Sequence, residues 1–332
     1  MLRRCAARAS EPPGFLCHHG RRLWYLRFHA ASPFRRKTWG RQRYRDGQPL
    51  PRRNQTWSHS EAAQLNLFFC QANLSKTQLH RLLAHPLTAG LELDDPATTE
   101  RRRQIILSKP FLKAIYDEWY SVLASQLPEG KGAVLELGSG AGYCDRFIPG
   151  LITSEVFACP TVQLLLDAQQ IPFADGSLRG IVFTDVMHHM TDVRRFFAEA
   201  SRCLRKGGKV LMIEPWVTAW SRFVYQHLHH EPFSPEAPDW SFQSTGALSG
   251  ANGALPWIVF VRDRNKFESE FPELEIEQIR PFLPFRYLVS GGVGMRSLMP
   301  SFTHSAWVRL EAMLEPHMSS LAMFAFISLC RR

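Results

Sequence analysis

The sequence contains no apolar run of about 18 residues, the length that a membrane-spanning helix needs. It also lacks any Cys-x-x-Cys pair, and its seven cysteines are scattered and odd in number. This usage argues against a disulfide framework or a structural zinc site, and favours reduced thiols in a cytosol-like compartment. We therefore predict a cytoplasmic protein without a transmembrane segment, whose 332 residues suffice for one large core or two smaller ones.

Acidic residues are scarce at the start of the chain. Residues 1–57 hold 14 Lys and Arg but only Glu11 and Asp46, whereas the remainder is close to neutral, with 26 basic and 28 acidic residues. Three interpretations of this basic leader stay open: a disordered tail touching RNA or anionic lipid, an organelle import signal, or residues without a function. The near-neutral remainder argues against nucleic acid as a partner of the folded part.

A glycine-rich loop follows an apolar segment at residues 133–142. Val134, Leu135 and Leu137 suit a strand that is buried on both faces. The glycines that follow allow a sharp turn and a close approach to a ligand, and they are Gly138, Gly140 and Gly142. Glu136 precedes them and is placed to accept hydrogen bonds from a cationic amine. A dinucleotide-binding loop would read Gly-x-Gly-x-x-Gly, with the third glycine one position later.

Downstream of this loop, predicted strands and helices alternate. This order indicates a mostly parallel, doubly wound Rossmann-like α/β sheet. The expected elements are strands Leu151–Ser154, Val162–Leu166, Gly180–Val186 and Lys209–Glu214, with a helix from Asp192 to about Leu204 that Thr191 caps and Gly207-Gly208 stops. Ligands bind beyond the carboxyl ends of such strands, where we expect Glu155, Asp167, Asp185, His188 and Glu214.

The segments on either side of this alternation complete the expected domain. Helical periodicity predicts helices at Ser60–Phe69, Thr77–Leu83 and from Asp95 or Thr98 through Leu127, with a break or start at Pro110. Leu274–Ile279 and Leu321–Leu329 predict a final antiparallel pair. We divide the chain into the leader at 1–57, a helical lead-in at 58–128, and a main domain at 129–332 with insertions at 216–267 and 281–318.

The chain resembles class I S-adenosylmethionine-dependent methyltransferases, and within them the type 11 subgroup that includes quinone-biosynthesis enzymes. Four ordered motifs carry the resemblance, which covers about residues 130–215: Glu136–Gly142, Asp167–Ser177, Asp185–His189 and Leu204–Val210. The resemblance implies S-adenosyl-L-methionine as the cofactor. It also implies a Rossmann-like sheet and methyl transfer by in-line displacement, for which no metal is required.

The resemblance further assigns cofactor-binding residues. The loop residues Gly138, Ser139, Gly140 and Gly142 would line the methionine part, with Glu136 near its amino group. Glu155, at the end of the second strand, would accept the ribose hydroxyls, and Asp167 with the backbone of Ala168 would contact the adenine edge. The alternatives are a solvated loop acid for Glu155 and a turn cap for Asp167.

The cofactor half is shorter than the family leads us to expect. Only 12 residues separate Gly142 from Glu155, so the first helix after the loop must be short. Six residues separate Glu155 from Val162, whereas a crossover helix needs a dozen or more. Either that helix is missing or the third strand lies elsewhere.

Two groups are candidates for the acceptor side. His188 is the candidate general base, because a neutral imidazole accepts a proton near pH 7, and Asp185 would orient it or contact the acceptor. The alternative is that His188 and His189 pack or cap the following helix. His227, His230 and Glu231 would share one face of a helix and hold a metal or a polar substrate. A solvated histidine group is the simpler interpretation, and we predict no metal.

The insertion after the fifth strand is rich in aromatic residues. Nine fall within residues 216–260, which predicts a lid with an apolar lining, a small satellite core, or both. The Gly291-Gly292-Val293-Gly294 loop of the second insertion would border the substrate. We therefore predict a methyltransferase for a small, partly apolar acceptor such as a lipid, a quinone-like compound or a secondary metabolite, with peripheral membrane contact left open. The alternatives are a non-catalytic methyltransferase-like scaffold, an NAD-dependent oxidoreductase and an RNA methyltransferase.

Overall fold

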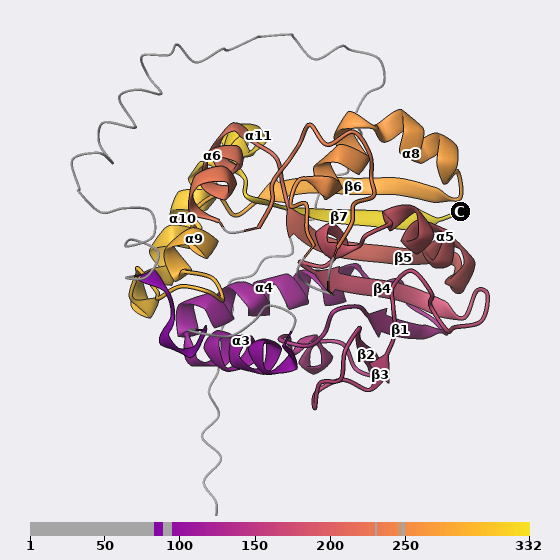
Figure 1. Cartoon of the computed structure of the whole chain (residues 1–332), viewed down its shortest axis with the longest axis horizontal. Helices are drawn as coiled ribbons and strands as arrows, with labels where there is room; N and C mark the ends of the chain where they lie inside the picture. Colours follow the sequence, from indigo (N-terminus) through magenta and orange to yellow (C-terminus); the bar gives the residue numbers. More distant parts are fainter. Residues whose placement is uncertain (1–82, 89–94, 230, 245, 247–249) are drawn as a thin grey trace, which may run out of the picture. The chain divides into compact units, whose positions relative to one another are not determined.

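The computed structural model describes residues 83–88, 95–229, 231–244, 246 and 250–332 (Figure 1). The chain divides into two units, Met1–Cys70 and Gln71–Arg332, and all described residues belong to the second. The basic leader and the helices expected at Ser60–Phe69 and Thr77–Leu83, apart from Leu83, lie outside these residues. Among the described residues, no helix is both long enough and apolar enough to cross a membrane.

One seven-stranded sheet organises the fold, in the order β3-β2-β1-β4-β5-β7-β6. The first five strands of that order run parallel, and β7 is antiparallel to both of its neighbours. The strands are β1 (Ala133–Glu136), β2 (Leu151–Glu155), β3 (Leu164–Leu165), β4 (Leu178–Thr184), β5 (Leu204–Pro215), β6 (Leu274–Phe282) and β7 (Phe324–Arg331). The predicted Rossmann-like sheet with an antiparallel last strand is confirmed.

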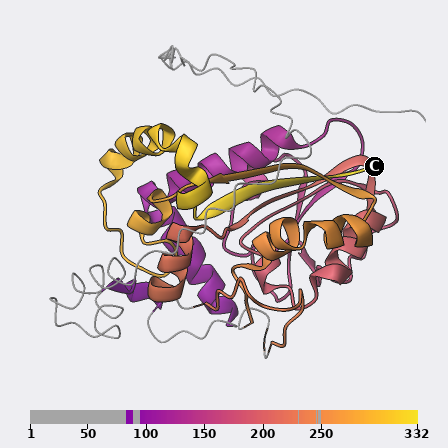
Figure 2. The same ribbon diagram turned by 90° about the horizontal axis from the view of Figure 1, so that it is seen from above.

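Continuous apolar runs place β4 and β5 at the centre of the core. Ile181, Val182 and Phe183 of β4 are fully buried, as are Val210 and Leu211 of β5. A strand that buries both faces needs this pattern, because helices cover the sheet on each side. Figure 2 shows α4 (Pro110–Gln126) along one face, and α5 (Val193–Cys203) with α8 (Arg264–Glu270) along the other.

Several boundaries differ from those predicted. Helix α5 begins after Asp192, whose carboxylate accepts the N–H of Arg194, so Asp192 and not Thr191 is the cap. The helix ends at Cys203, ahead of Gly207, because Leu204 already pairs with Leu178 of β4. Sheet pairing thus overrides the glycine stop signal.

Of the two explanations for the short spacing between β2 and β3, the structure shows that the crossover helix is missing. Residues 156–163 form bends and one turn without a helix, and β3 is reduced to Leu164–Leu165, paired in parallel with the end of β2. The first helix after the glycine loop is a single 3-10 turn, Cys144–Arg146. The cofactor half of the sheet is therefore covered by loops and by the lead-in helices.

The lead-in consists of two helices that meet at Lys109. Helix α3 (Pro96–Ser108) is capped by Asp95, and α4 follows it directly from Pro110. The buried Lys109 ammonium donates to the carbonyls of Gly292 (2.7 Å) and Met295 (2.9 Å). Burial lowers the pKa of Lys109 to about 8. This contact fastens the glycine-rich loop of the second insertion to the lead-in.

Helices from both insertions, and the short helix that follows the second, gather where β5 ends and β7 begins, at the left of Figure 1. They are α6 (Ala219–Leu228), α9 (Arg286–Ser290), α10 (His304–Met313) and α11 (Met318–Leu321). Farther along the first insertion, α7 (Leu255–Trp257) and a π-helical turn (Ile258–Arg262) lead into α8. The carboxyl ends of the parallel strands are therefore covered by inserted helices.

A buried ion pair joins α9 and α10. The Arg286 guanidinium contacts Glu311 at 2.5 Å and the partly exposed Glu118 of α4 at 2.7 Å. We expect Arg286→Met to lower the free energy of unfolding by about 3–5 kcal/mol, because the buried Glu311 carboxylate loses its countercharge. Urea denaturation measures this. The exposed pair Arg264–Glu268 provides the control, since Arg264→Met should cost less than about 1 kcal/mol. Equal losses in the two variants would contradict the assignment.

Candidate functional site

The glycine loop is fastened to β2 by hydrogen bonds. The Ser139 N–H donates to the Ser154 carbonyl (2.8 Å), and the Ser139 hydroxyl accepts the Ser154 N–H (3.1 Å). The Gly142 N–H closes the turn onto the Ser139 carbonyl (2.8 Å). The Ser139 backbone and side chain thus both hold the glycine loop against the end of β2.

Two glycines are required by what packs against the loop. Gly138 adopts a φ of 65°, and a Cβ there would lie 2.5 Å from Val186, the residue after Asp185. A Cβ on Gly142 would lie 2.5 Å from the Tyr120 hydroxyl of α4. The loop is therefore held between the end of β4 and helix α4, and the first of these contacts brings it next to Asp185.

We expect Gly142→Ala to destabilise the protein by about 1–3 kcal/mol, because the added methyl overpacks against Tyr120. Combining it with Tyr120→Phe, which removes the contacted hydroxyl, should recover part of that loss. Thermal and urea unfolding of the four members of this cycle measure the coupling. Gly294→Ala is the matched control, since a Cβ there meets nothing within 4 Å. Additive losses at 142 and 120 would show that the contact is unimportant.

Glu136 is a buried carboxylate whose nearest influence of opposite charge, Arg103, forms no ion pair with it. It is 4% exposed, and among the described residues no Lys or Arg forms an ion pair with it. Burial raises the pKa of Glu136 to about 7, against the effect of a hydrogen bond from Ser139. A buried acid in this state is stabilised by a cation. The residue therefore fits the amino group of a ligand.

Glu155 is turned toward the glycine loop. Its carboxylate accepts the N–H groups of Gly140 (3.2 Å) and Val156 (2.9 Å), and burial raises its pKa. These bonds bring the end of β2 and the loop together. A carboxylate has room for about four hydrogen bonds, so acceptor sites remain for hydroxyl groups.

Asp167 is exposed and follows Leu166, whose N–H donates to the Glu155 carbonyl (3.0 Å). The Asp167 carboxylate accepts the backbone N–H of Gln169 at 2.8 Å, whereas the neighbouring Ala168 is buried. The structure thus brings together Glu136, Gly138, Ser139, Gly140, Gly142 and Glu155. Asp167 forms the turn cap that was the alternative interpretation, and contact of Asp167 and Ala168 with adenine stays a prediction.

A cluster of ionisable side chains surrounds His188 beyond the ends of β4 and β5. His188 Nδ1 lies 2.8 Å from a Glu214 oxygen, and Nε2 lies 3.5 Å from a Glu231 oxygen. Asp185 contributes a carboxylate oxygen within 4.8 Å of His188 and Glu214. The backbone N–H groups of Val186 and Met187 donate to the other Glu214 oxygen, both at 2.8 Å. The imidazole is therefore held by carboxylates on both ring nitrogens.

These carboxylates set the charge of His188. Burial alone would lower its pKa, but the contacts with Glu214 and Glu231 raise it well above the usual value. Against the effect of burial, His188 holds the pKa of Glu231 well below its usual value. Burial raises the pKa of Asp185 to about 7, although His188 opposes that shift. An imidazole committed to two carboxylates fits poorly the predicted role of His188 as general base.

Asp185 has an unusual backbone. Its φ is 60°, in the left-handed region that few non-glycine residues adopt, and its N–H donates to the Ile213 carbonyl of β5 (2.9 Å). Such strain persists only where the surrounding structure enforces it, and it concentrates at functional sites. Among the described residues, no hydrogen bond reaches the Asp185 carboxylate. The strained turn therefore presents an open acceptor group.

Aromatic hydroxyls flank this cluster. Tyr116 of α4, Tyr225 of α6 and Tyr287 of α9 are all placed so that the Asp185 charge adds to burial in raising their pKa values. Tyr116 lies 5.8 Å, ring centre to ring centre, from Tyr120, which contacts the glycine loop. Helix α4 thus spans the distance from the glycine loop to the ionisable cluster.

The first insertion closes over the two histidines. The His188 carbonyl accepts the Asn252 N–H (2.9 Å), and His189 Nδ1 lies 3.0 Å from the Gly250 carbonyl. Burial lowers the pKa of His189 to about 4. The predicted lid therefore supplies backbone contacts to the cluster as well as aromatic side chains.

Sequence reasoning missed Glu231 and the role of Glu214 as partners of His188. Helix α6 ends at Leu228, so the helical face predicted to join His227 and Glu231 does not extend to Glu231, and His230 lies outside the described residues. Glu231 turns toward His188 instead, while His227 contacts the Phe223 carbonyl on its own helix. The position of Glu214 at the end of β5 could have identified it as a partner of His188, whereas no local sequence pattern indicates that Glu231 is one.

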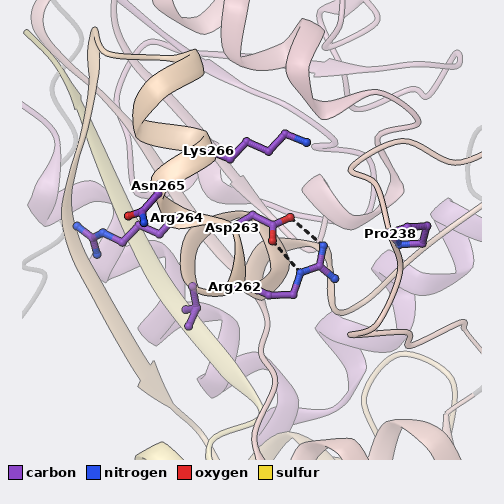
Figure 3. A pocket seen from close by; sticks show the side chains of 7 residues that line it. Pro238, Arg262, Asp263, Arg264, Asn265 and Lys266 are labelled. Carbon is purple, nitrogen blue, oxygen red and sulfur yellow. Dashed lines mark hydrogen bonds and ion pairs between the residues drawn. The ribbon is translucent and has the colours of Figure 1, made fainter. Parts of the chain in front are cut away.

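A cavity of about 460 Å³ lies elsewhere, beside the π-helical turn and α8 (Figure 3). Arg262 pairs with Asp263 at 2.8 Å and donates to the carbonyls of Pro235 and Ala237. Asp263 also accepts the Trp240 indole N–H. These groups are occupied with one another, and none of the predicted site residues lines this cavity.

Comparisons with known proteins found one family model and several solved structures that are similar to this chain. Residues 150–212 match a family model described as a methyltransferase domain. No curated protein matches the chain. The geranyl diphosphate C-methyltransferase of Streptomyces coelicolor A3(2), solved with Mg²⁺, geranyl diphosphate and S-adenosyl-L-homocysteine, is similar with 13% identity and a TM-score of 0.43, over 75% of this chain and 92% of that one. The YcgJ protein of Bacillus subtilis is similar with 14% identity and a TM-score of 0.38, over 64% and 97%.

The sheet order defines a Rossmann-like domain, in which the buried Glu136 directly precedes the glycine loop. Residues 150–212 of this domain match the methyltransferase-domain family, and the resemblance to class I enzymes predicts S-adenosyl-L-methionine as the cofactor. The narrower quinone-biosynthesis subgroup stays a prediction.

Proposed function

We propose that this enzyme methylates a small, partly apolar acceptor bound between the carboxyl ends of β4 and β5 and the inserted helices. The observation that carries the proposal is the adjacency of two groups of residues. Val186 contacts Gly138 of the glycine loop, and Val186 directly follows Asp185. In-line displacement needs donor and acceptor side by side, and this contact supports such an arrangement.

The donor side would use Glu136 and the glycine loop. Glu136 would accept hydrogen bonds from the cofactor's amino group, and the loop backbone would contact its methionine part. Glu155 would accept the ribose hydroxyls with the oxygens that also hold Gly140, and Asp167 with Ala168 would lie nearest the adenine. When bound, S-adenosylmethionine supplies a methyl group on a positively charged sulfur, which a nucleophile displaces.

On the acceptor side, Asp185 is the better candidate for the general base. It presents a carboxylate free of hydrogen bonds from the described residues, whereas His188 has a carboxylate at each ring nitrogen. The acceptor atom would gain the methyl group and pass its proton to Asp185, while the electron pair of the broken carbon–sulfur bond stays with sulfur. His188 would then orient the carboxylates around the acceptor.

The residues around Asp185 favour an acceptor with an apolar body and one polar end. Tyr116, Tyr225 and Tyr287 supply ring faces, and Tyr287 itself packs against Trp119 at 5.8 Å and Phe324 at 4.9 Å. Few polar groups set in a mostly aromatic wall are typical of small-molecule sites. This composition fits a lipid, a quinone-like compound or a secondary metabolite.

The test is methyl transfer from isotope-labelled S-adenosylmethionine to a fractionated metabolite extract, read by mass spectrometry. We expect label in products that partition into organic solvent, and loss of that label with Asp185→Asn. Labelled protein or RNA with unlabelled small molecules would contradict the proposed acceptor class. Binding of the cofactor without any labelled product would support a scaffold instead.

A further inference from the structure

We propose that His188, His189 and Glu231 bind one divalent metal ion of the zinc class. Both imidazoles direct Nε2 toward the Glu231 carboxylate, at 3.5 Å for His188 and 4.0 Å for His189. One potential ligand atom from each of the three residues lies within 4.8 Å of the other two. Two imidazoles and one carboxylate form a ligand set that zinc uses in catalytic sites.

The direction of the outer hydrogen bonds supports this proposal. His189 Nδ1 lies 3.0 Å from the Gly250 carbonyl, which can only accept, so Nδ1 carries the hydrogen. His188 Nδ1 likewise faces the Glu214 carboxylate at 2.8 Å. A neutral ring held in this way presents a lone pair at Nε2, as His189 does, and His188 would present one when a metal ion displaces its Nε2 proton. Two lone pairs and a carboxylate therefore converge, and a cation between them would stabilise the arrangement.

The same outer contacts are those that metal-binding histidines usually have. Such residues donate their second ring N–H to a carboxylate or a backbone carbonyl, which fixes the ring orientation. Here His188 has the carboxylate partner and His189 the carbonyl partner. Glu214 is fixed in turn by the N–H groups of Val186 and Met187. The hydrogen bonds that would orient the metal-binding rings are therefore already present in the structure.

A proton on His188 explains only part of this geometry. It would bridge His188 to Glu231 but would leave the Nε2 lone pair of His189 facing the other Glu231 oxygen. The two rings lie 4.2 Å apart, centre to centre, and the Nε2 atoms of both face the Glu231 carboxylate. Tetrahedral zinc with bonds of about 2.0–2.1 Å places its ligand atoms about 3.4 Å apart. The measured separations need only small side-chain adjustments to reach that value.

Three protein ligands leave one coordination position open for water or a substrate oxygen. His188 and Glu231 are 2% and 18% exposed, so the site is enclosed but reachable. Metal binding as such does not depend on the proposed acceptor chemistry. It is therefore measured without cofactor or acceptor, and failure of one proposal does not entail failure of the other.

The experiment uses the full chain with any affinity tag removed, stripped with chelator and titrated with Zn²⁺ and Co²⁺. We expect about one equivalent of bound Zn²⁺ by elemental analysis and visible absorption from bound Co²⁺. The variants His189→Gln and Glu231→Gln each remove one ligand and should weaken binding at least about 10- to 100-fold, the loss seen even for second-layer changes. Their unfolding temperatures, measured without metal, establish that they fold.

His227→Gln is the matched control, because His227 lies on helix α6 and its ring is hydrogen-bonded to the Phe223 carbonyl of that helix. It should retain the wild-type affinity. The proposal is overturned if the stripped wild type binds no stoichiometric Zn²⁺ or Co²⁺, or if folded His189→Gln and Glu231→Gln proteins bind as the wild type does.

Discussion

Replacing Glu136 by glutamine is expected to weaken S-adenosylmethionine binding about 10- to 100-fold. The lost interaction is a charge-assisted hydrogen bond to the cofactor's amino group, and such bonds contribute about 1.5–3 kcal/mol. Glutamine keeps the size of the side chain, so the loop geometry should survive. Equilibrium dialysis or calorimetry measures the affinity. Glu129→Gln, an exposed acid in the turn before β1, is the control and should bind as the wild type does.

The same substitution should stabilise the ligand-free protein. Because burial raises the pKa of Glu136 from its ordinary value of 4.5 to about 7, the folded state holds a proton that the unfolded state has released. The free energy of unfolding therefore falls as pH rises through that interval, by up to about 3 kcal/mol. Glu136→Gln should lose this dependence and be more stable than the wild type near pH 8. A variant that loses both stability and affinity would point to a purely structural role.

Cofactor affinity should depend on pH for the same reason. Only ionised Glu136 attracts the ammonium group, so affinity should rise up to about pH 7 and level off or fall near pH 8, where an α-amino group deprotonates. In Glu136→Gln the rise below pH 7 should vanish. A pH-independent affinity in the wild type would show that another group binds the amine.

Replacing Asp185 by asparagine is expected to lower the methyl-transfer rate about 10²- to 10⁴-fold, the usual contribution of a general base. Cofactor affinity should change little, since the backbone turn is kept. Asparagine tolerates the left-handed conformation at φ 60° as aspartate does, so folding should be preserved. Single-turnover measurements with an acceptor found in the extract screen would separate this step from binding.

The control for this substitution is Asp175→Asn, an exposed acid paired with Arg202. It should leave the rate within about twofold of the wild type, as surface substitutions usually do. If Asp185→Asn transfers methyl groups at the wild-type rate, the base lies elsewhere. Equal losses in rate and cofactor affinity would mean that Asp185 supports the glycine loop.

The parallel sheet was predictable because each of its central strands has a recognisable local sequence pattern. Val134 and Leu135 are apolar, as are the runs 181–183 and 210–213, and strands buried on both faces need such runs. The strand ends at Glu155 and Glu214 were also visible in sequence. The predicted boundaries that were wrong depend on pairing between distant segments. Helix α5, for example, ends before Gly207-Gly208 because Leu204 pairs with β4.

The sequence predicted more residues of the donor site than of the acceptor site. The glycine loop and its acids lie within a few residues of one another, so their spacing carries information. The partners of His188 do not: Glu231 comes from an insertion whose path is set by tertiary contacts such as that of Asn252 with the His188 carbonyl. A helical pattern assigned Glu231 to the wrong neighbours, because α6 ends three residues earlier.

Calorimetric titration of the purified chain with S-adenosylmethionine, S-adenosylhomocysteine and NAD⁺ in parallel tests the donor site most directly. We predict saturable binding of the two adenosyl compounds at one site per chain, abolished or strongly weakened by Glu136→Gln, and no heat with NAD⁺. Absence of binding to both adenosyl compounds at millimolar concentration, or preferential binding of NAD⁺, would contradict the methyltransferase assignment.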